Sequence, residues 1–362
     1  MMITSEVIKV LIPAAAAFVV GILAAPLLTH YLYKYKCWKK TAQKVALDGT
    51  AAVEFEALRA QGETRAGTET RTPRMGGVLI WASATAVTLL MWLLARALPT
   101  PWTLKLDFLS RSQTWIPLVT LLAGSLMGFV NDLLDIRPGG EQGIRLRTRL
   151  LFVTAVSGFV GYWFYAKLGM TAIGIPGDGT LALGALIVPL FILVSLGIYA
   201  GGVIDGIDGL SGGIFGSAFM AYAGIAYFQD QLNLAAFAAT VAGAILAFLW
   251  FNIPPARFWM TETGTMGLTM TLAVIAFMTD TLGGGYGVLA LPIIAFPLVI
   301  TVLSNIVQVV SKKLRGGKKV FRIAPLHHHF EAIGWPSYKV TMRYWVISVV
   351  CAILGMTVAL LK

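Results

Sequence analysis

Charged residues are scarce in this chain. Asp, Glu, Lys and Arg together make up 12% of its 362 residues, which is about half the share that soluble domains carry. Acidic residues are the scarcer sign, with 17 Asp and Glu against 28 Lys and Arg. This composition excludes an ordinary soluble globular protein. It also disfavours nucleic acid as a partner, because no soluble basic domain exists to bind it.

Cysteine is almost missing. Cys37 and Cys351 fall in a basic loop and in the last apolar segment, so neither a disulfide framework nor a cysteine-based metal site is predicted. The short alternating segments of a membrane β-barrel are missing too, and continuous apolar runs of helix length recur instead. With 57% hydrophobic residues, the sequence predicts an all-α polytopic membrane protein that forms one integral domain over residues 1–362.

About ten membrane-spanning helices are predicted. The first is long for a signal-peptide core and lacks a basic leader, so we expect it to be retained. Pro292 and Pro297 predict that the ninth helix is bent or broken. The predicted spans are 8–28, 76–98, 115–131, 150–166, 181–200, 210–228, 234–251, 265–281, 287–310 and 342–361.

The distribution of Lys and Arg predicts the orientation. Only six of the 28 lie outside the loops after odd-numbered spans and the membrane edges of those loops. Positive loops stay cytoplasmic, so both termini should face outward. The largest inner loop, 29–74, contains a segment at 51–67 that we expect to be an amphipathic surface helix or a mobile insert. The outer segment 173–181 predicts a small turn or hairpin.

Six acidic residues and three adjacent histidines fall on the inner loops, although the orientation used only Lys and Arg. Carboxylates from separate loops on one face suggest a shared site, because ionisable groups at the membrane edge are costly and often functional. The residues are Asp132, Asp135, Asp205, Asp208, Glu262, Glu331, His327, His328 and His329.

Each group also has a structural interpretation. Asp132 with Asp135, and Asp205 with Asp208, have the i, i+3 spacing of one helix face. The first pair could be solvated charges at a helix end, and the second could belong to a flexible glycine-rich turn. The glycines around the second pair equally suit close approach to a phosphate or sugar.

The remaining polar residues can likewise be interpreted as structural or as functional. Asn252 could end a helix before two prolines, and Glu262 could interact with the N-terminus of the next helix. Three consecutive histidines, 327–329, favour contact with a substrate or phosphate. A zinc site is disfavoured, because adjacent histidines rarely supply a tetrahedral set and no cysteines accompany them.

Carboxylates and histidines on a cationic face suit magnesium-assisted phosphoryl transfer. When one phosphate attacks another, a divalent cation screens the repulsion between them. Mg²⁺ takes oxygen ligands, often one or two carboxylates together with substrate phosphates.

Five motifs, in this order, resemble those of one enzyme family. They are TPRMGG at 72–77, GFVND at 128–132, DGIDGL at 205–210, FLWFN at 248–252 and FRIAPLHHHFE at 321–331. Over nearly its whole length the chain is similar to the bacterial phospho-N-acetylmuramoyl-pentapeptide-transferase family (MraY), a branch of the polyprenyl-phosphate N-acetylhexosamine-1-phosphate transferases. The histidine motif is the most specific, because it separates this family from relatives that use simpler UDP-sugars.

The resemblance implies a reaction and a place for it. Phospho-MurNAc-pentapeptide would pass from UDP-MurNAc-pentapeptide to undecaprenyl phosphate, giving lipid I and UMP for peptidoglycan synthesis. The enzyme would be a Mg²⁺-dependent homodimer among the lipids of the bacterial cytoplasmic membrane, with its active site on the cytoplasmic face. The lipid substrate would enter beside the ninth helix.

Two other functions remain open: a related transferase for another UDP-N-acetylhexosamine, and an inactive scaffold. A transporter is disfavoured, because transporters place charged sites near the bilayer midplane.

The resemblance also assigns roles to residues. Asp132 and Asn131 occupy the catalytic pair, with Asp132 as the base or phosphate-activating group; a covalent nucleophilic aspartate is the alternative. Asp132 and Glu262 would bind the metal. The substrate-binding positions are Arg74, Asp205, Asp208, Asn252, Trp259, Gln308, His327, His328 and His329.

Several positions depart from the family pattern. Arg74 replaces a threonine and would restore a cation near the nucleotide, and Glu262 replaces a metal-binding aspartate with one extra methylene. We expect an active lineage, because Asp132, a carboxylate at 262 and the histidines survive together. The remaining departures are Asn131 for Asp, Gly202 for Asn, and Glu69 and Asp135 for Lys.

Overall fold

The computed structural model describes residues 2–40, 68–137, 143–175, 177 and 179–361. The segment 51–67, predicted as an amphipathic helix or mobile insert, lies outside the described residues. Regular structure in the described part is almost entirely helical, as the composition predicts for a polytopic membrane protein.

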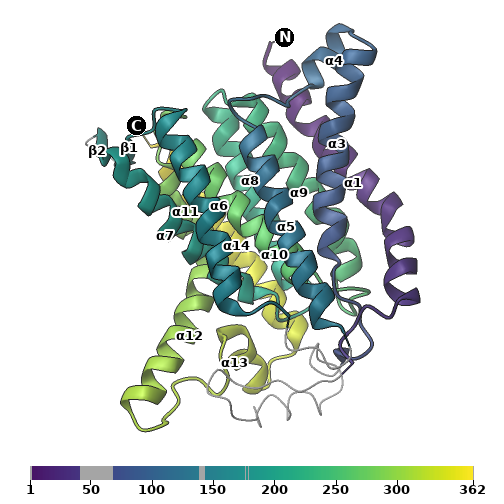
Figure 1. Cartoon of the computed structure of the whole chain (residues 1–362), viewed down its shortest axis with the longest axis vertical. Coiled ribbons are helices and arrows are strands. Elements are labelled where there is room, and N and C mark those ends of the chain that lie inside the picture. Colours follow the sequence, from purple (N-terminus) through teal and green to yellow (C-terminus); the bar gives the residue numbers. More distant parts are fainter. Residues whose placement is uncertain (1, 41–67, 138–142, 176, 178, 362) are drawn as a thin grey trace.

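Long helices form a bundle (Figure 1). They are α1 (Met2–Lys34), α3 (Gly77–Ala97), α5 (Trp115–Asp135), α6 (Leu146–Ala166), α7 (Ile187–Ala200), α8 (Leu210–Phe228), α9 (Leu232–Asn252), α10 (Thr261–Met278), α12 (Phe296–Leu314) and α14 (Ser337–Leu360). The shorter helices are α4 (Pro101–Leu106), α11 (Gly287–Ile294) and α13 (Leu326–Ala332), with 3₁₀ turns η2 (Gly184–Leu186) and η3 (Gly201–Ile204).

One small sheet is present in the described residues. Strands β1 (Ala172–Ile175) and β2 (Gly179–Ala182) pair antiparallel, with Ile173 opposite Leu181. The sequence predicts a small turn or hairpin at 173–181, and the structure has a hairpin there. It lies at the end of the bundle where α1 begins and α14 ends (Figure 1).

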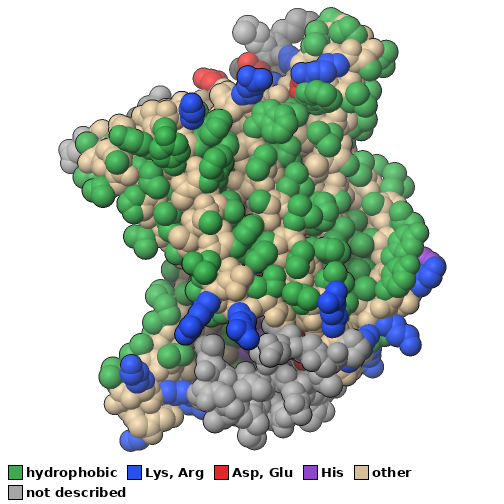
Figure 2. All heavy atoms as spheres, viewed as in Figure 1, with side chains coloured by type: hydrophobic (Ala, Val, Ile, Leu, Met, Phe, Trp, Pro, Cys, Tyr) green, Lys and Arg blue, Asp and Glu red, His purple; other side chains and the backbone are tan. Residues whose placement is uncertain are grey.

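Burial separates core helices from those that face lipid. The most apolar window of α9 is 83% buried and that of α8 is 72% buried, whereas that of α1 is 22% buried. Figure 2 shows hydrophobic side chains over the middle of the visible face, with Lys and Arg toward its two ends. A large continuous apolar surface is rare in soluble monomers and marks contact with lipid or another protein, so this pattern fits a membrane protein.

Nine helices in the described part are long and apolar enough to cross a membrane. Helix α10, which corresponds to the predicted span 265–281, is not among them, because its sequence contains five threonines and Glu262. All its residues from Thr263 to Met278 are buried. Protein therefore surrounds α10, and its surface does not need the apolar composition that lipid requires.

The ninth predicted span, 287–310, consists of two helices. α11 ends and α12 begins at Ala295, with Pro292 inside α11 and Pro297 in the first turn of α12. Proline lacks the amide hydrogen that would continue the helical ladder. Figure 1 shows α12 diverging from the bundle at the end where α13 lies.

Candidate active site

Asp132 lies in the last turn of α5 and is fully buried. Its Oδ2 accepts hydrogen bonds from Thr261 Oγ1 at 2.5 Å, from Thr263 N at 2.9 Å and from Thr263 Oγ1 at 2.6 Å. Its Oδ1 faces Arg74 Nη2 at 3.4 Å. Oδ2 is therefore held by the start of α10, and Oδ1 is the oxygen with fewer partners among the described residues.

Close packing of α5 against α10 brings Asp132 to this position. A Cβ at Gly128, one turn earlier on α5, would collide with the carbonyl oxygen of Glu262. The backbone is also unusual here, since Met75 has φ +66° and Thr261 has φ +53°. Non-glycine residues adopt this left-handed region rarely and at a cost, and such residues cluster at functional sites.

Two arginines neutralise the acids of the centre. Arg74 Nη2 lies 3.2 Å from Asp135 Oδ2 in addition to its contact with Asp132, and Arg149 of α6 forms an ion pair with Glu262. The Nε atoms of Arg74 and Arg149 are buried and have no hydrogen-bond partner among the described residues. A buried donor without an acceptor is costly. A phosphate would supply the missing acceptors, because its oxygens pair well with guanidinium groups.

The carboxylates at this centre fit one kind of magnesium site. Glu262 lies between Thr261 and Thr263, the two residues that hold Asp132, so both carboxylates belong to one place. In the described part of the chain, no group of three or more His, Cys, Asp or Glu could hold a metal ion. The donors thus fit Mg²⁺ that takes one or two carboxylates plus substrate phosphates, and they do not fit a closed protein cage.

The glycine-rich loop between η3 and α8 carries Asp205 and Asp208, and both aspartates contact residues near the start of α10. Asp205 Oδ2 accepts from Thr261 N at 2.8 Å, and Asp205 Oδ1 accepts from Ser211 Oγ at 2.8 Å. Asp208 Oδ2 accepts from Ala256 N at 3.0 Å, and its Oδ1 accepts from Trp259 Nε1 at 3.0 Å. The two aspartates therefore anchor the glycine-rich loop to the segment before α10.

The histidines lie against the same loop. A Cβ at Gly206 would collide with Nε2 of His327, and it would lie 2.8 Å from Nε2 of His328. Both histidines are buried, and their ring centroids are 4.4 Å apart. His328 Nδ1 lies 2.6 Å from Glu331 Oε2, and Ser337 Oγ donates to Glu331 Oε1 at 2.6 Å. Helix α13 thus presents two ring nitrogens to the loop of Asp205 and Asp208.

His329 has different surroundings. Its Nδ1 accepts a hydrogen bond from Arg322 N at 3.1 Å, and its ring packs edge-on against Phe321. Partial burial, and then the nearby Arg322 charge, lower the pKa of His329. A neutral ring suits its role as an acceptor, so His329 supports the loop before α13.

Three predicted site residues hold backbone in place. Asn131 Oδ1 accepts from Ile144 N at 2.9 Å. Asn252 accepts from Gly209 N at 3.0 Å and donates to the carbonyl of Phe258 at 2.9 Å. Gln308 bonds three times to the backbone of residues 320–321. Their amides fix the loops that carry the acids and histidines.

Sequence reasoning missed three residues of this centre: Arg149, Thr261 and Thr263. Arg149 was visible only as one inner-loop cation among many, and nothing in the sequence linked it to Glu262. The threonines look like ordinary small residues at the start of a helix. Only the packing of α5 and α6 against α10 shows their contacts.

Comparison with known proteins gives the following matches. Residues 114–280 match a family model described as glycosyl transferase family 4. A phospho-N-acetylmuramoyl-pentapeptide-transferase of Geobacillus sp. (strain WCH70) is 35% identical, covering 83% of this chain and 87% of the relative. That of Bacillus subtilis (strain 168) is 32% identical, covering 93% of this chain and 94% of the relative. That of Anoxybacillus flavithermus (strain DSM 21510 / WK1) is 31% identical, covering 96% of each.

Proposed function

Since the chain belongs to the phospho-N-acetylmuramoyl-pentapeptide-transferase family, we propose that it catalyses the reaction of that name. It transfers phospho-MurNAc-pentapeptide from UDP-MurNAc-pentapeptide to undecaprenyl phosphate and yields lipid I and UMP. The observation that carries the proposal is the joining of five distant segments at one end of the bundle. Hydrogen bonds and close contacts link Arg74, Asp132, Asp205, Thr261 and His327 in one continuous network.

The proposed site faces the cytoplasm. It lies at the end of the bundle where the loops carry most Lys and Arg, and such loops are retained inside. The same charge would draw two anionic substrates to this face. We further propose that the protein is a homodimer, which mass photometry of nanodisc-embedded protein would measure directly.

In the proposed mechanism, the residues of the chain bind the donor, orient it and accept a proton from the lipid phosphate. Arg74 and Arg149 bind the pyrophosphate of the donor, with their Nε donors satisfied by its oxygens. Asp132 accepts the proton of the lipid phosphate. A lipid phosphate oxygen then bonds to the phosphorus that carries the sugar. The P–O bond to UMP breaks, and its electron pair leaves with UMP.

Asp132 and Glu262 would hold Mg²⁺ together with the substrate phosphates. When bound, the ion would screen the repulsion between the two phosphates and the charge that develops on the leaving oxygen. Two carboxylates at one place support this proposal, since Mg²⁺ commonly binds this way.

The test is a two-substrate assay on purified protein in detergent. UMP should appear only when UDP-MurNAc-pentapeptide, undecaprenyl phosphate and Mg²⁺ are all present, and mass spectrometry should identify lipid I. Asp132→Asn should lower turnover by about a hundredfold or more, as expected for a lost general base. The matched control Asp107→Asn changes an aspartate that pairs with Arg96 and ends α4, at the opposite end of the bundle from α13 (Figure 1). It should leave turnover unchanged.

The alternatives predict different results in the same assay. A related transferase would release UMP with UDP-GlcNAc and not with the pentapeptide donor. An inactive scaffold would bind the nucleotide sugar without releasing UMP under any condition. Either result would reject the proposed reaction.

A further inference from the structure

Helix α14 contacts the backbone of the glycine-rich loop at the point where this loop ends and α8 begins. Thr341 Oγ1 donates to the carbonyl oxygen of Asp208 at 3.1 Å, and Trp345 Nε1 donates to the carbonyl oxygen of Gly209 at 3.0 Å. From α9, Asn252 Oδ1 accepts from the amide of Gly209 at 3.0 Å. Two different helices therefore hold the peptide unit between Asp208 and Gly209, one at its carbonyl and one at its amide.

The carbonyl of Gly209 lies at the junction of the loop and α8. Gly209 is the residue before the first turn of α8 and has φ +76°, a left-handed conformation that glycine adopts at little cost. Its carbonyl also accepts from Gly213 N at 3.3 Å. The indole of Trp345 therefore supplies the shorter of the two bonds that fix this carbonyl.

A glycine of α8 makes room for the indole ring. A Cβ at Gly213 would collide with Nε1, Cε2 and Cδ1 of Trp345, so the five-membered ring lies directly against the α8 backbone. Tryptophans at a membrane edge are amphipathic anchors whose N–H commonly faces the wet side. Trp345 instead directs its N–H to the backbone of the loop, which gives the side chain a second role.

The loop in turn contacts the residue that orients Asp132. Asp205 Oδ2 accepts from the amide of Thr261, and Thr261 Oγ1 donates to Asp132 Oδ2. Thr261 has a positive φ of +53°, and such a backbone persists only where its surroundings hold it. A shift of the loop would therefore move Thr261 and, with it, the carboxylate of Asp132.

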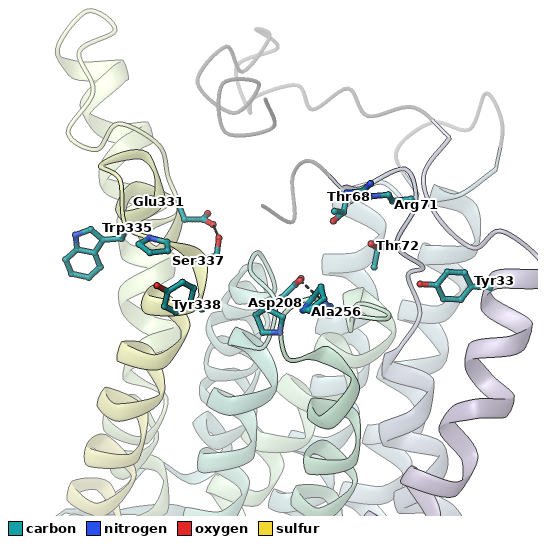
Figure 3. Close-up of a pocket in the computed structure, with 13 residues that line it drawn as sticks. Tyr33, Thr68, Arg71, Thr72, Asp208, Ala256, Glu331, Trp335, Ser337 and Tyr338 are labelled. Atoms are coloured by element: carbon teal, nitrogen blue, oxygen red, sulfur yellow. Dashed lines mark hydrogen bonds between the residues drawn. The ribbon is translucent and has the colours of Figure 1, made fainter. Parts of the chain in front are cut away.

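The same loop borders a cavity. Asp208 and Ala256 line a space of about 810 Å³, together with residues of the segment 68–72 and the start of α14. Figure 3 shows Asp208 between Tyr338 of α14 and Thr72. A loop that borders a cavity is packed on one side only, so its position depends on protein contacts elsewhere along it. Thr341 and Trp345 supply such contacts about one and two helical turns further along α14 than the residues that line the cavity.

We propose that Thr341 and Trp345 of α14 are positioning residues for the transfer reaction. They fix the end of the glycine-rich loop, and the loop in turn fixes Thr261 and Asp132. The inference rests on the proposed function, in which Asp132 accepts the proton of the lipid phosphate. Both residues act through the loop, and neither takes part in proton or phosphoryl transfer.

The first test measures backbone protection and needs no substrate. Trp345→Phe keeps an aromatic ring against Gly213 and removes the N–H donor. Hydrogen–deuterium exchange on the purified full-length protein in detergent should then be about fivefold faster in residues 201–213, which is within the net effect of one hydrogen bond. Exchange in the rest of α8 should not change.

The second test measures turnover with Mg²⁺ and both substrates. Trp345→Phe should lower kcat about fivefold and leave the KM of each substrate within twofold, because a misplaced Asp132 impairs the chemical step more than ground-state binding. Thr341→Val removes the hydroxyl with little change of shape and should give the same pattern. Trp345→His should recover part of kcat, since its imidazole can place an N–H donor where the indole has Nε1.

Ser348→Ala is the matched control. Ser348 lies on the same helix, is fully buried, and shares a hydrogen bond of 2.7 Å with Ser217 of α8. The control therefore removes a bond between the same two helices that does not involve the loop. It should change neither the exchange of residues 201–213 nor kcat, and it should melt at about the same temperature as Trp345→Phe.

Three results would overturn the proposal. If Trp345→Phe and Ser348→Ala lower kcat equally, α14 serves only the packing of the bundle. If residues 201–213 exchange at the wild-type rate in both Trp345→Phe and Thr341→Val, the two donors do not fix the loop. If a KM rises while kcat stays unchanged, the residues act on substrate binding and not on Asp132.

Failure of the proposed function is a separate observation. The wild-type protein would then release no UMP with both substrates present. The exchange experiment would still show whether α14 fixes the loop, because it requires no turnover.

Discussion

Two of the positions at which this sequence departs from the family pattern lie next to each other in the structure. Arg74 and Asp135 both differ from the family pattern, and they form an ion pair with each other at 3.2 Å. Lys39 adds a second cation 3.3 Å from Asp135. Arg74 therefore places a cation beside position 135, where the family resemblance implies a lysine. Only the fold shows that the two changed positions lie next to each other.

Sequence reasoning singled out candidates where the residue types are unusual. Asp132, Asp205 and the paired histidines, which the structure brings to one end of the bundle, stand out because acids and histidines are rare in an apolar chain and costly at its membrane edge. It failed for Arg149, since arginines at the inner edge are common and most have no catalytic role. It also failed to predict that Asn131 supports the backbone at Ile144, because an amide next to Asp132 looks like its partner in the candidate pair.

Arg149 gives a prediction at this scale. Arg149→Ala should weaken donor binding by about tenfold or more, because it removes both the partner of Glu262 and the group that we propose binds a donor phosphate. Arg149→Lys should lose less. Donor affinity can be measured by calorimetry in Mg²⁺, with Arg147→Ala as a control, since Arg147 is an exposed neighbour on the same helix. An affinity of Arg149→Ala within twofold of the wild type would show that Arg149 serves only the fold.

At the scale of elements, the contact of α5 with α10 sets the geometry of the centre. Periodicity and hydropathy predicted both helices, but not that they touch at Gly128. Glycine in a membrane helix has several meanings, among them close helix packing and flexibility. The same limit applies to α10. Its threonines predict a weakly apolar membrane span, but in the structure they are buried against other helices.

Gly128→Ala should reduce turnover strongly, because its methyl group would collide with the Glu262 carbonyl and displace the helix that carries Asp132. The matched control is Gly158→Ala on α6, where the nearest atom to a new Cβ would be 3.8 Å away. Thermal denaturation in detergent would accompany the turnover assay. Equal turnover for both variants would mean that α5 and α10 can separate without disturbing the site.

At the scale of the whole molecule, charge distribution and fold agree. The loops with most Lys and Arg join the candidate site at one end, while α1 begins and α14 ends at the other (Figure 1). The succession of long apolar helices and the gathering of the basic loops at one end could be predicted, because they depend on simple solvation of charge and apolar surface. The cavity beside Asp208 could not, because its walls come from segments more than two hundred residues apart.

The predicted orientation can be tested on spheroplasts and inverted membrane vesicles. Epitope tags fused at either terminus should be accessible from outside the cytoplasmic membrane, whereas a tag inserted after Gly316, in the turn that follows α12, should be protected. Protease digestion of spheroplasts and of inverted vesicles would measure both. Protection of the terminal tags in spheroplasts would reverse the orientation and place the site outside.

The enclosure of α10 by other helices has a consequence for biogenesis. A segment with five threonines and a glutamate gains little when it moves alone from a protein-conducting channel into lipid. Helix α10 packs extensively against α5, which is synthesised well before it. We therefore expect α10 to enter a partly assembled bundle, and the end of the protein that carries the candidate site to form only after α5 is in place.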